Sequence, residues 1–502
     1  METTAKTQSY TKKERNYYLV GLTGQNVIFG ICSVLAYYFQ FTLLIPAMAV
    51  SVILTANQIW DALKDPIMGN IVDRTRSKWG KARPYLLFAP LPIGCLTVLC
   101  FVNGIYDSAQ SVTSGQNLLI VIWAVASYFL WGLAYTSADI PLNSLPTLMT
   151  EDKNDRTKLI SSKIIAVVIG SLLGFAVQPM ALQAGSLWSG GTSSAQQSER
   201  LGFISVVIPL ALLGVTMFQL AGIFTRERVA LSEKVYSVKE NLKLMWSNKP
   251  FRAMMLSGMI ASLKSVEGVA ALPLFSYYYA NKDPAKIVVY TVLLGVGAYI
   301  GKFAAAKLLP KLTAKYEKSK LYNFCNLMII PSTLFVFLLY LCAPTQMAEP
   351  VFIALTATAF TVGSVFHTFV GILTQLFTAD AVDYEEYRSG VRPDGVFASG
   401  LTMLVKFGAG ISTLVGGISY TLVGFTSQRV EALNSFIDAG GIARISDEFA
   451  PYMMILFFLY NIPTVIGALL CVIPTWRYPL KDKEHEEILE ELNQRRHTAV
   501  NL

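Results

Sequence analysis

Long apolar runs separated by short polar segments make up most of this chain. About twelve of the runs hold roughly 20 residues or more, enough for an α-helix to cross a hydrocarbon core of about 30 Å. The pattern therefore predicts an all-α membrane protein with about twelve transmembrane helices. The expected spans are 17–45, 47–72, 84–105, 116–146, 158–184, 202–225, 252–281, 286–309, 321–343, 350–378, 395–425 and 449–475.

The composition agrees with a location in a lipid bilayer. Of the 502 residues, 53% are hydrophobic and 15% are charged, whereas a soluble protein carries about 25% charged residues. The formal net charge of +8 could indicate a nucleic-acid partner, but the basic residues fall in alternate loops, as the positive-inside rule expects. We therefore expect contact with the lipid bilayer and no nucleic-acid binding.

The loops also predict the orientation. Lys and Arg cluster before the first span and after the second, fourth and eighth, whereas 41–50 contains neither and 103–116 has Asp107 as its only charge. We expect a multi-pass protein of the cell (inner or plasma) membrane with both termini cytoplasmic. The N-terminus shows no cleavable signal pattern, so the first helix is expected to be retained. The six cysteines lie in or at the ends of apolar runs without metal-ligand spacing, which argues against a disulfide framework or a zinc site.

A polar segment divides the spans six and six. We predict an N-terminal six-helix bundle over 1–226, a cytoplasmic linker over 227–250, a C-terminal six-helix bundle over 251–480 and a cytoplasmic tail over 481–502. The linker is basic, and the tail has the alternating charges of a short surface helix. Two bundles of equal size are typical of a transporter with parallel halves.

Three charged residues lie inside the second span. Asp61 and Asp65 are four residues apart, so their carboxylates share one helical face, and Lys64 stands between them in the sequence. A charge at the centre of a membrane helix costs about 2.5–3.5 kcal/mol on insertion scales, so such residues tend to line a cavity and serve function. The two carboxylates predict a site for a small cation or a proton.

A second polar face lies on the fourth span. Trp131, Tyr135 and Asp139 follow one another at intervals of four, and Thr136 and Asn143 lie close to the same face. A carboxylate accepts hydrogen bonds from sugar hydroxyls, and an aromatic plane covers the apolar face of a sugar ring, so this face suits a polyhydroxylated ring. The alternative is that the polar groups only join helices to one another. Other polar residues within spans are Gln25, Lys163, Thr402 and Lys406.

The sequence does not assign a role to three further ionisable residues within the spans. Lys264 and Glu267 are three residues apart in the seventh span, and we expect them to pair; His367 lies in the tenth span. The chain shows no nucleophile elbow, metal-binding His pair or Walker-type sequence. It is therefore expected to be neither an enzyme nor an ATP-driven pump, and to need no cofactor.

Several motifs together resemble one family. They are Asp61-Ala-Leu-Lys-Asp65-Pro-Ile-Met-Gly69 with the following Arg74-Thr-Arg-Ser-Lys-Trp-Gly80-Lys-Ala-Arg-Pro84, then Tyr135-Thr-Ser-Ala-Asp139-Ile-Pro141, the stretch Ala379 to Arg392, and Thr402 to Lys406. They run over nearly the whole chain in the order found in the melibiose permease-like glycoside–pentoside–hexuronide:cation symporters. The resemblance implies the major facilitator fold.

The resemblance also implies residue roles. Asp61, Asp65 and Thr136 fall at the family's cation site, Tyr135 and Asp139 at its sugar site. Lys163 stands in place of a sugar-site arginine, and Thr402 and Lys406 fall beside both sites. Three positions depart from the pattern: Gln25 replaces an aspartate, Asn143 a tryptophan and Lys64 a cation-site asparagine.

We interpret the chain as a secondary transporter that imports a glycoside or sugar acid by alternating access with cation symport. The expected substrate-binding residues are Gln25, Trp131, Tyr135, Asp139, Asn143, Lys163, Thr402 and Lys406, and the expected cation-coupling residues are Asp61, Lys64, Asp65 and Thr136. The Lys64 ammonium would fill the sodium position, which favours the proton over sodium at Asp61 and Asp65. Lys163, Lys264 and Lys406 favour an anionic sugar, with a neutral glycoside as the alternative. The loops of the cytoplasmic gate are expected to contribute Arg74, Arg83, Asp380, Asp383 and Arg392. We expect a monomer; the rival functions are a lysolipid-type transporter of the same fold and a non-transporting sensor.

Overall fold

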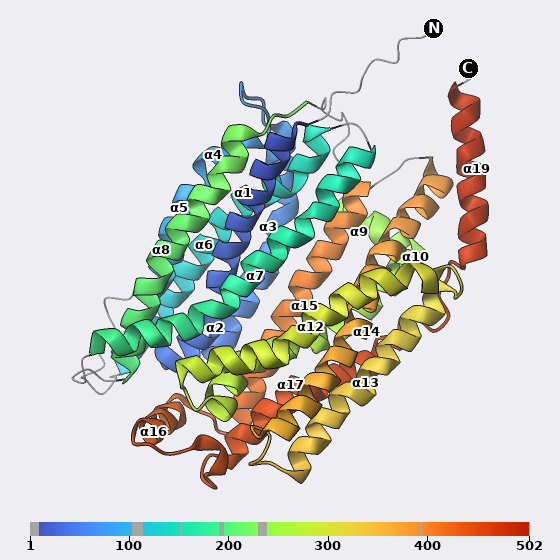
Figure 1. Cartoon of the computed structure of the whole chain (residues 1–502). Coiled ribbons are helices and arrows are strands. Elements are labelled where there is room, and N and C mark those ends of the chain that lie inside the picture. The colour runs from blue at the N-terminus through green and yellow to red at the C-terminus, as the bar shows by residue number, and fades with distance from the viewer. Residues whose placement is uncertain are drawn as a thin grey trace. The chain divides into compact units, whose positions relative to one another are not determined.

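The computed structural model describes residues 10–102, 114–150, 153–189, 195–228, 238–390 and 394–500. The regular elements in these ranges are all helices (Figure 1), so the predicted all-α fold is confirmed. Within the described part of the chain, nine helices are long and apolar enough to cross a membrane, and the helical stretches Pro90–Phe101 and Pro284–Gly297 are apolar but shorter.

The first six predicted spans correspond to helices in the first half of the chain. The second span is one helix, α3, and the third is divided into α4 and α5, with Pro90 at the start of α5. The helices are α1 (Lys12–Ser33), α2 (Leu35–Tyr37), the π-helical turn η1 (Tyr38–Thr42), α3 (Ala47–Arg74), α4 (Arg83–Phe88), α5 (Pro90–Phe101), α6 (Ser114–Met149), α7 (Lys153–Ser189) and α8 (Ala195–Phe224).

The other six predicted spans correspond to helices in the second half. The seventh is broken into four helical segments, and the twelfth into two. The elements are α9 (Val238–Ser247), α10 (Lys249–Ala261), η2 (Ser262–Val266), α11 (Glu267–Pro273), η3 (Leu274–Tyr279), α12 (Pro284–Thr313), α13 (Lys318–Cys342), α14 (Pro350–Ser389), α15 (Asp394–Leu422), α16 (Ser427–Asp438), η4 (Ala443–Ile445), α17 (Ala450–Leu470), α18 (Val472–Thr475) and α19 (Asp482–Val500).

The chain forms two compact units. The first unit contains Met1–Val235, Asp283–Val288 and Thr426–Asp438; the second contains Tyr236–Lys282, Val289–Phe425 and Ala439–Leu502. The predicted bounds of the two bundles, the linker and the tail stay a prediction. The tail does form a helix, α19, and the predicted linker contains the short helix α9.

Small residues let the helices of the first unit approach closely. A Cβ on Gly174 of α7 would lie 2.7 Å from the Cα of Gly30 of α1, and a Cβ on Gly24 would lie 2.5 Å from the carbonyl oxygen of Gly214 of α8. Membrane helices pack through such small residues because lipid supplies no hydrophobic force between them. The packing fixes α1 and with it Gln25, which lies one residue after Gly24.

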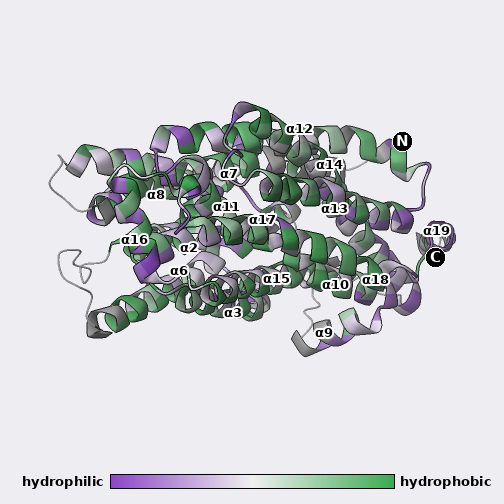
Figure 2. Ribbon diagram, turned by 90° about the horizontal axis from the view of Figure 1, so that it is seen from below, coloured by the Kyte–Doolittle hydropathy of each residue, from purple (hydrophilic) through white to green (hydrophobic). Residues whose placement is uncertain are grey.

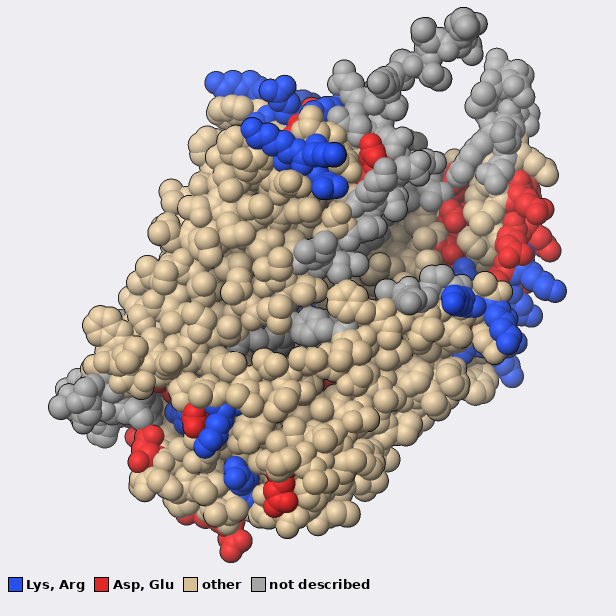
Figure 3. Space-filling view, viewed as in Figure 1, with Lys and Arg blue, Asp and Glu red and all other residues tan. Residues whose placement is uncertain are grey.

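The outward faces of the long helices are apolar. On α3, the exposed side chains Ile59, Leu63, Ile67 and Ile71 follow at intervals of four. Figure 2 shows the long helices largely in hydrophobic colours, whereas α16 and α19 are more hydrophilic. On the face drawn in Figure 3, the charged side chains gather near helix ends and leave the flanks uncharged. This distribution is the one expected for helices that face lipid.

Candidate functional site

The fourth predicted span forms α6, which carries an aromatic stack on one face. The rings of Trp131 and Tyr135 lie with their centroids 4.8 Å apart, and Trp131 also stacks on Tyr128. Trp131 is buried, and its indole N–H donates to the hydroxyl oxygen of Thr97 on α5 at 3.0 Å. The indole is therefore fixed against α5, and its ring stacks on that of Tyr135.

Gln25 of α1 joins this face. Its amide nitrogen donates to the hydroxyl oxygen of Tyr135 at 2.8 Å and to a carboxylate oxygen of Asp139. The sequence predicts these three residues as substrate ligands, and the structure brings them together from two helices. Because one amide group touches both the phenol and the carboxylate, Gln25 holds Tyr135 and Asp139 in a fixed relation.

The polar chain continues from Asp139 toward α7. Asn143 lies one turn further along α6, and its amide nitrogen donates to the Asp139 carboxylate at 2.8 Å. The Lys163 ammonium of α7 donates to the side-chain oxygen of Asn143 and interacts electrostatically with Asp139. Three helices of the first unit thus contribute to one hydrogen-bonded chain in which one negative and one positive charge balance.

The cation residues predicted on α3 also come together. The Lys64 nitrogen lies 2.6 Å from a carboxylate oxygen of Asp61, and both side chains are largely buried. The hydroxyl of Thr136 on α6 donates weakly to Asp65 at 3.5 Å and to the carbonyl oxygen of Gly132 at 3.1 Å. The sequence-predicted group of two acids, one ammonium and one hydroxyl is therefore assembled between α3 and α6.

The sequence reasoning missed two residues beside this group. Asn57 is 2% exposed, and a Cβ on Gly132 would lie 2.7 Å from its side-chain oxygen and 3.2 Å from the Lys64 nitrogen. Because Gly132 has no side chain, it leaves space for the amide of Asn57 and the ammonium of Lys64. A signal for Asn57 was present, because it precedes Asp61 by four residues, the same interval that separates Asp61 from Asp65.

Arg83, predicted for the gate, lies in a polar network at one end of the first unit. Its guanidinium donates to the carbonyl oxygens of Gly222 and Ile223 at the end of α8. Glu227 accepts the backbone N–H groups of Lys81, Ala82 and Arg83 at 2.9–3.0 Å and so caps the N-terminus of α4.

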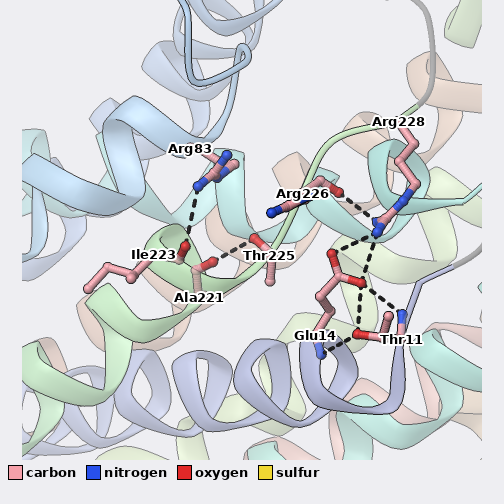
Figure 4. A network of polar contacts seen from close by, with 8 residues as sticks. All are labelled: Thr11, Glu14, Arg83, Ala221, Ile223, Thr225, Arg226 and Arg228. Carbon is pink, nitrogen blue, oxygen red and sulfur yellow. Dashed lines mark hydrogen bonds and ion pairs between the residues drawn. The ribbon is translucent and has the colours of Figure 1, made fainter.

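Arg228 extends the same network to α1. Its guanidinium donates to both carboxylate oxygens of Glu14, at 2.9 and 3.0 Å, and Glu14 and Thr11 cap the start of α1 (Figure 4). The loop after α3, the end of α8 and the start of α1 are therefore joined. Arg74, by contrast, is exposed at the end of α3.

The gate residues predicted in the second unit contact the tail. The Lys318 ammonium at the start of α13 pairs with Asp380 of α14 and lies 3.5 Å from Asp482 of α19. His485 of α19 lies 3.1 Å from Asp383. Asp380 and Asp383 therefore help to dock α19 on α14. Arg392 lies outside the described residues.

Two predicted ligands and one predicted pair lie elsewhere in the second unit. Thr402 and Lys406 are one turn apart on α15, where Thr402 is exposed and Lys406 half-buried. The ion pair expected between Lys264 and Glu267 is not formed in the described part of the chain; this expectation is wrong. The Lys264 ammonium donates instead to the side-chain oxygen of Asn326 on α13 at 2.7 Å.

Comparisons with known proteins point to sugar transporters. The family described as MFS/sugar transport protein matches residues 17–482. The glucuronide carrier protein homolog of Escherichia coli (strain K12) is 27% identical over 494 residues, which cover 97% of this chain and 96% of that protein. The putative glycoside/cation symporter YagG of the same organism is 27% identical over 431 residues, covering 85% and 87%. The isoprimeverose transporter of Lactiplantibacillus pentosus is 26% identical over 432 residues, covering 84% and 83%.

Solved structures agree on the fold. The crystal structure of a D-xylose-proton symporter superposes with a TM-score of 0.58 at 12% sequence identity and covers 92% of this chain and 97% of that one. These findings confirm the resemblance to the glycoside–pentoside–hexuronide:cation symporters and the prediction of a transporter rather than an enzyme. The chain therefore belongs to the MFS/sugar transport protein family and is a multi-pass membrane protein of the major facilitator superfamily.

Proposed function

We propose that the protein imports a glycoside or sugar acid across the cell membrane by alternating access, coupled to the entry of a cation. The observation that carries the proposal is the polar chain from Gln25 through Asp139 and Asn143 to Lys163, beside the Tyr135 ring. A carboxylate, amides, a phenol and an ammonium offer both acceptors and donors to sugar hydroxyls, and the ring offers an apolar plane.

The relatives support the class of substrate. Their names state glycoside/cation symport, glucuronide transport and isoprimeverose transport. All three substrates are sugars or sugar derivatives, and the first name includes a coupling cation. The proposal further includes a monomer with both termini cytoplasmic, Thr402 and Lys406 as additional ligands, and a cytoplasmic gate formed by the loops around Arg83 and Asp380.

The site in the first unit also supports proton coupling. The Lys64 ammonium lies 2.6 Å from Asp61 and so occupies one side of the carboxylate that a sodium ion would need. Two positive charges a few ångströms apart repel strongly in a partly buried site. A proton on Asp61 or Asp65 needs no such space, because it adds to an oxygen that is already present.

Counterflow in proteoliposomes tests the proposed function. Vesicles that contain the purified protein and an unlabelled sugar should take up the same labelled sugar transiently above equilibrium, without any ion gradient. A panel of glycosides, pentosides and hexuronides would identify the substrate. Counterflow with no member of the panel would contradict the proposal.

Replacing Lys64 by Asn should change the response to sodium. We expect sodium to have little effect on wild-type uptake and lower external pH to stimulate it, because the ammonium takes the place of a metal ion. Lys64→Asn removes that charge, and we expect sodium to stimulate its uptake several-fold. The measurement is initial uptake with sodium exchanged for choline at fixed pH, with Lys320→Gln, an exposed lysine on α13, as the matched control. Strong sodium dependence of the wild type would overturn the assignment.

A further inference from the structure

One buried polar side chain beside the coupling residues of α3 lacks a hydrogen-bond partner. Asn57 is 2% exposed, and neither its amide nitrogen nor its amide oxygen forms a hydrogen bond with the described residues. The Tyr128 hydroxyl of α6 is near this amide but does not form a hydrogen bond with it. A buried polar group without a partner destabilises a protein, so its presence needs an explanation. A partner that Asn57 gains in another state of the protein would supply one.

Asn57 lies on the same face of α3 as Asp61 and Lys64. The intervals between the three residues are four and three positions, which places them on successive turns of one helical face. A Cβ on Gly132 of α6 would lie 2.7 Å from the Asn57 side-chain oxygen and 3.2 Å from the Lys64 nitrogen. The amide and the ammonium therefore share the space beside Gly132, within reach of one another.

The Lys64 ammonium is held in the structure by an ionised acid. Its nitrogen lies 2.6 Å from a carboxylate oxygen of Asp61, and the lysine side chain is buried. A proton on Asp61 would remove the charge that holds the ammonium, and a buried ammonium needs an acceptor. A lysine in a helix extends toward the helix N-terminus, which is the direction of Asp61 and of Asn57 beyond it, and away from Asp65. The Asn57 oxygen is therefore placed to accept the ammonium.

The other titratable groups near Asp61 do not compete for this role. On α3 the further acid is Asp65, which follows Lys64 directly and accepts from a hydroxyl of α6. On α6 the titratable groups near Asp61 are Tyr128 and Tyr135. Phenols are uncharged at neutral pH, so they do not change the charge of the site.

We propose that Asn57 is a positioning residue of the proton-coupling site, and that its side-chain oxygen accepts the Lys64 ammonium while Asp61 carries the proton. This inference rests on the proposed proton coupling. One proton adds to the Asp61 carboxylate as the ammonium turns to the amide. When that proton leaves, the ammonium returns to the carboxylate, and Lys64 stays protonated throughout. Because Asn57 stabilises only the protonated state of Asp61, it sets the pH at which the proton binds.

Infrared titration of Asp61 tests this role without any sugar. The readout is the absorption band of protonated carboxyl groups, recorded over a series of pH values on the purified full-length protein in proteoliposomes. The part of the band that the double variant Asp61→Asn with Lys64→Met lacks belongs to Asp61. Asn57→Leu removes the acceptor and should move the midpoint of this part about one to two pH units lower, the equivalent of one hydrogen bond to a charged group.

A second variant should move the midpoint in the opposite direction. Asn57→Asp offers Lys64 a charged acceptor away from Asp61, and its negative charge favours a proton on Asp61, so the midpoint should rise. A purely structural role of Asn57 gives no reason for shifts of opposite sign. Asn461→Leu, which replaces a buried asparagine of α17, is the matched control and should keep the wild-type midpoint.

The outcomes separate this role from the proposed function. Midpoints that stay at the wild-type value or move in the same direction in both Asn57 variants would overturn the role, as would the absence of any pH-dependent band from Asp61. If Asn57→Leu does not fold, Asn57→Asp decides: a higher midpoint supports the role, and an unchanged one overturns it. Sugar counterflow with unshifted midpoints would reject only the role of Asn57, whereas shifted midpoints without counterflow of any sugar would contradict only the transport.

Discussion

Exchange of Asp139 for Asn is expected to weaken sugar binding by about tenfold to a hundredfold, because it removes the charged acceptor at the centre of the polar chain. The amide that replaces the carboxylate would also present an N–H group toward Gln25 or Asn143, both of which now donate to Asp139. The measurement is the Kd of the transported sugar on purified protein.

The control for this experiment is another Asp→Asn exchange. Asp447 is exposed, between η4 and α17, and its replacement should leave the Kd unchanged. The Asp139→Asn protein should elute as the wild type does in size exclusion, since a single isosteric change leaves helix packing intact. An unchanged Kd in Asp139→Asn would remove Asp139 from the sugar site.

The second large effect is expected at the acids of α3. Asp65→Asn should abolish accumulation of sugar against a gradient and leave exchange of internal for external sugar measurable. The reason is linkage: a cation that tightens sugar binding is itself bound more tightly when sugar is present, and removal of its site removes this coupling. Uptake under an imposed pH gradient, compared with counterflow, separates the two activities.

Asp61→Asn needs a companion variant. It removes the acid that lies 2.6 Å from the buried Lys64 ammonium, and breaking such a pair costs about 3–5 kcal/mol of stability. The double variant Asp61→Asn with Lys64→Met removes both charges and avoids this cost. If the double variant and Asp65→Asn both still accumulate sugar as the wild type does, the coupling site lies elsewhere.

The sequence predicts the helices well because a segment that crosses the lipid must be long, apolar and able to satisfy its own backbone hydrogen bonds. Each of the twelve predicted spans corresponds to a helix or to consecutive helical segments. The interruption at η2 is different, since nothing between Ser262 and Val266 breaks a helix by itself. The break depends on Ser412 and Thr464, which lie about 150 and 200 residues further along the chain. Such tertiary compensation is invisible in a local pattern.

The difference between local patterns and contacts from distant residues also explains which contacts of the candidate site the sequence predicts. Intervals of three and four residues on α3 and α6 predict shared faces, and the structure brings Asp61 to Lys64 and Asp139 to Asn143. The interval between Lys264 and Glu267 predicts a local pair in the same way. That prediction is wrong because Asn326, from a helix distant in the sequence, accepts the ammonium instead. Local spacing therefore indicates which side chains share a face, but it does not identify partners from other helices.

Sugar accumulation in proteoliposomes under an imposed pH gradient tests the central claim most directly. With an acidic exterior and no sodium, the wild-type protein should concentrate its sugar several-fold, whereas Asp139→Asn should take up little and Asp65→Asn should only equilibrate it. Equal accumulation by the wild type and both variants, or wild-type uptake that never exceeds equilibrium whichever cation gradient is imposed, would contradict cation-coupled sugar transport through these residues.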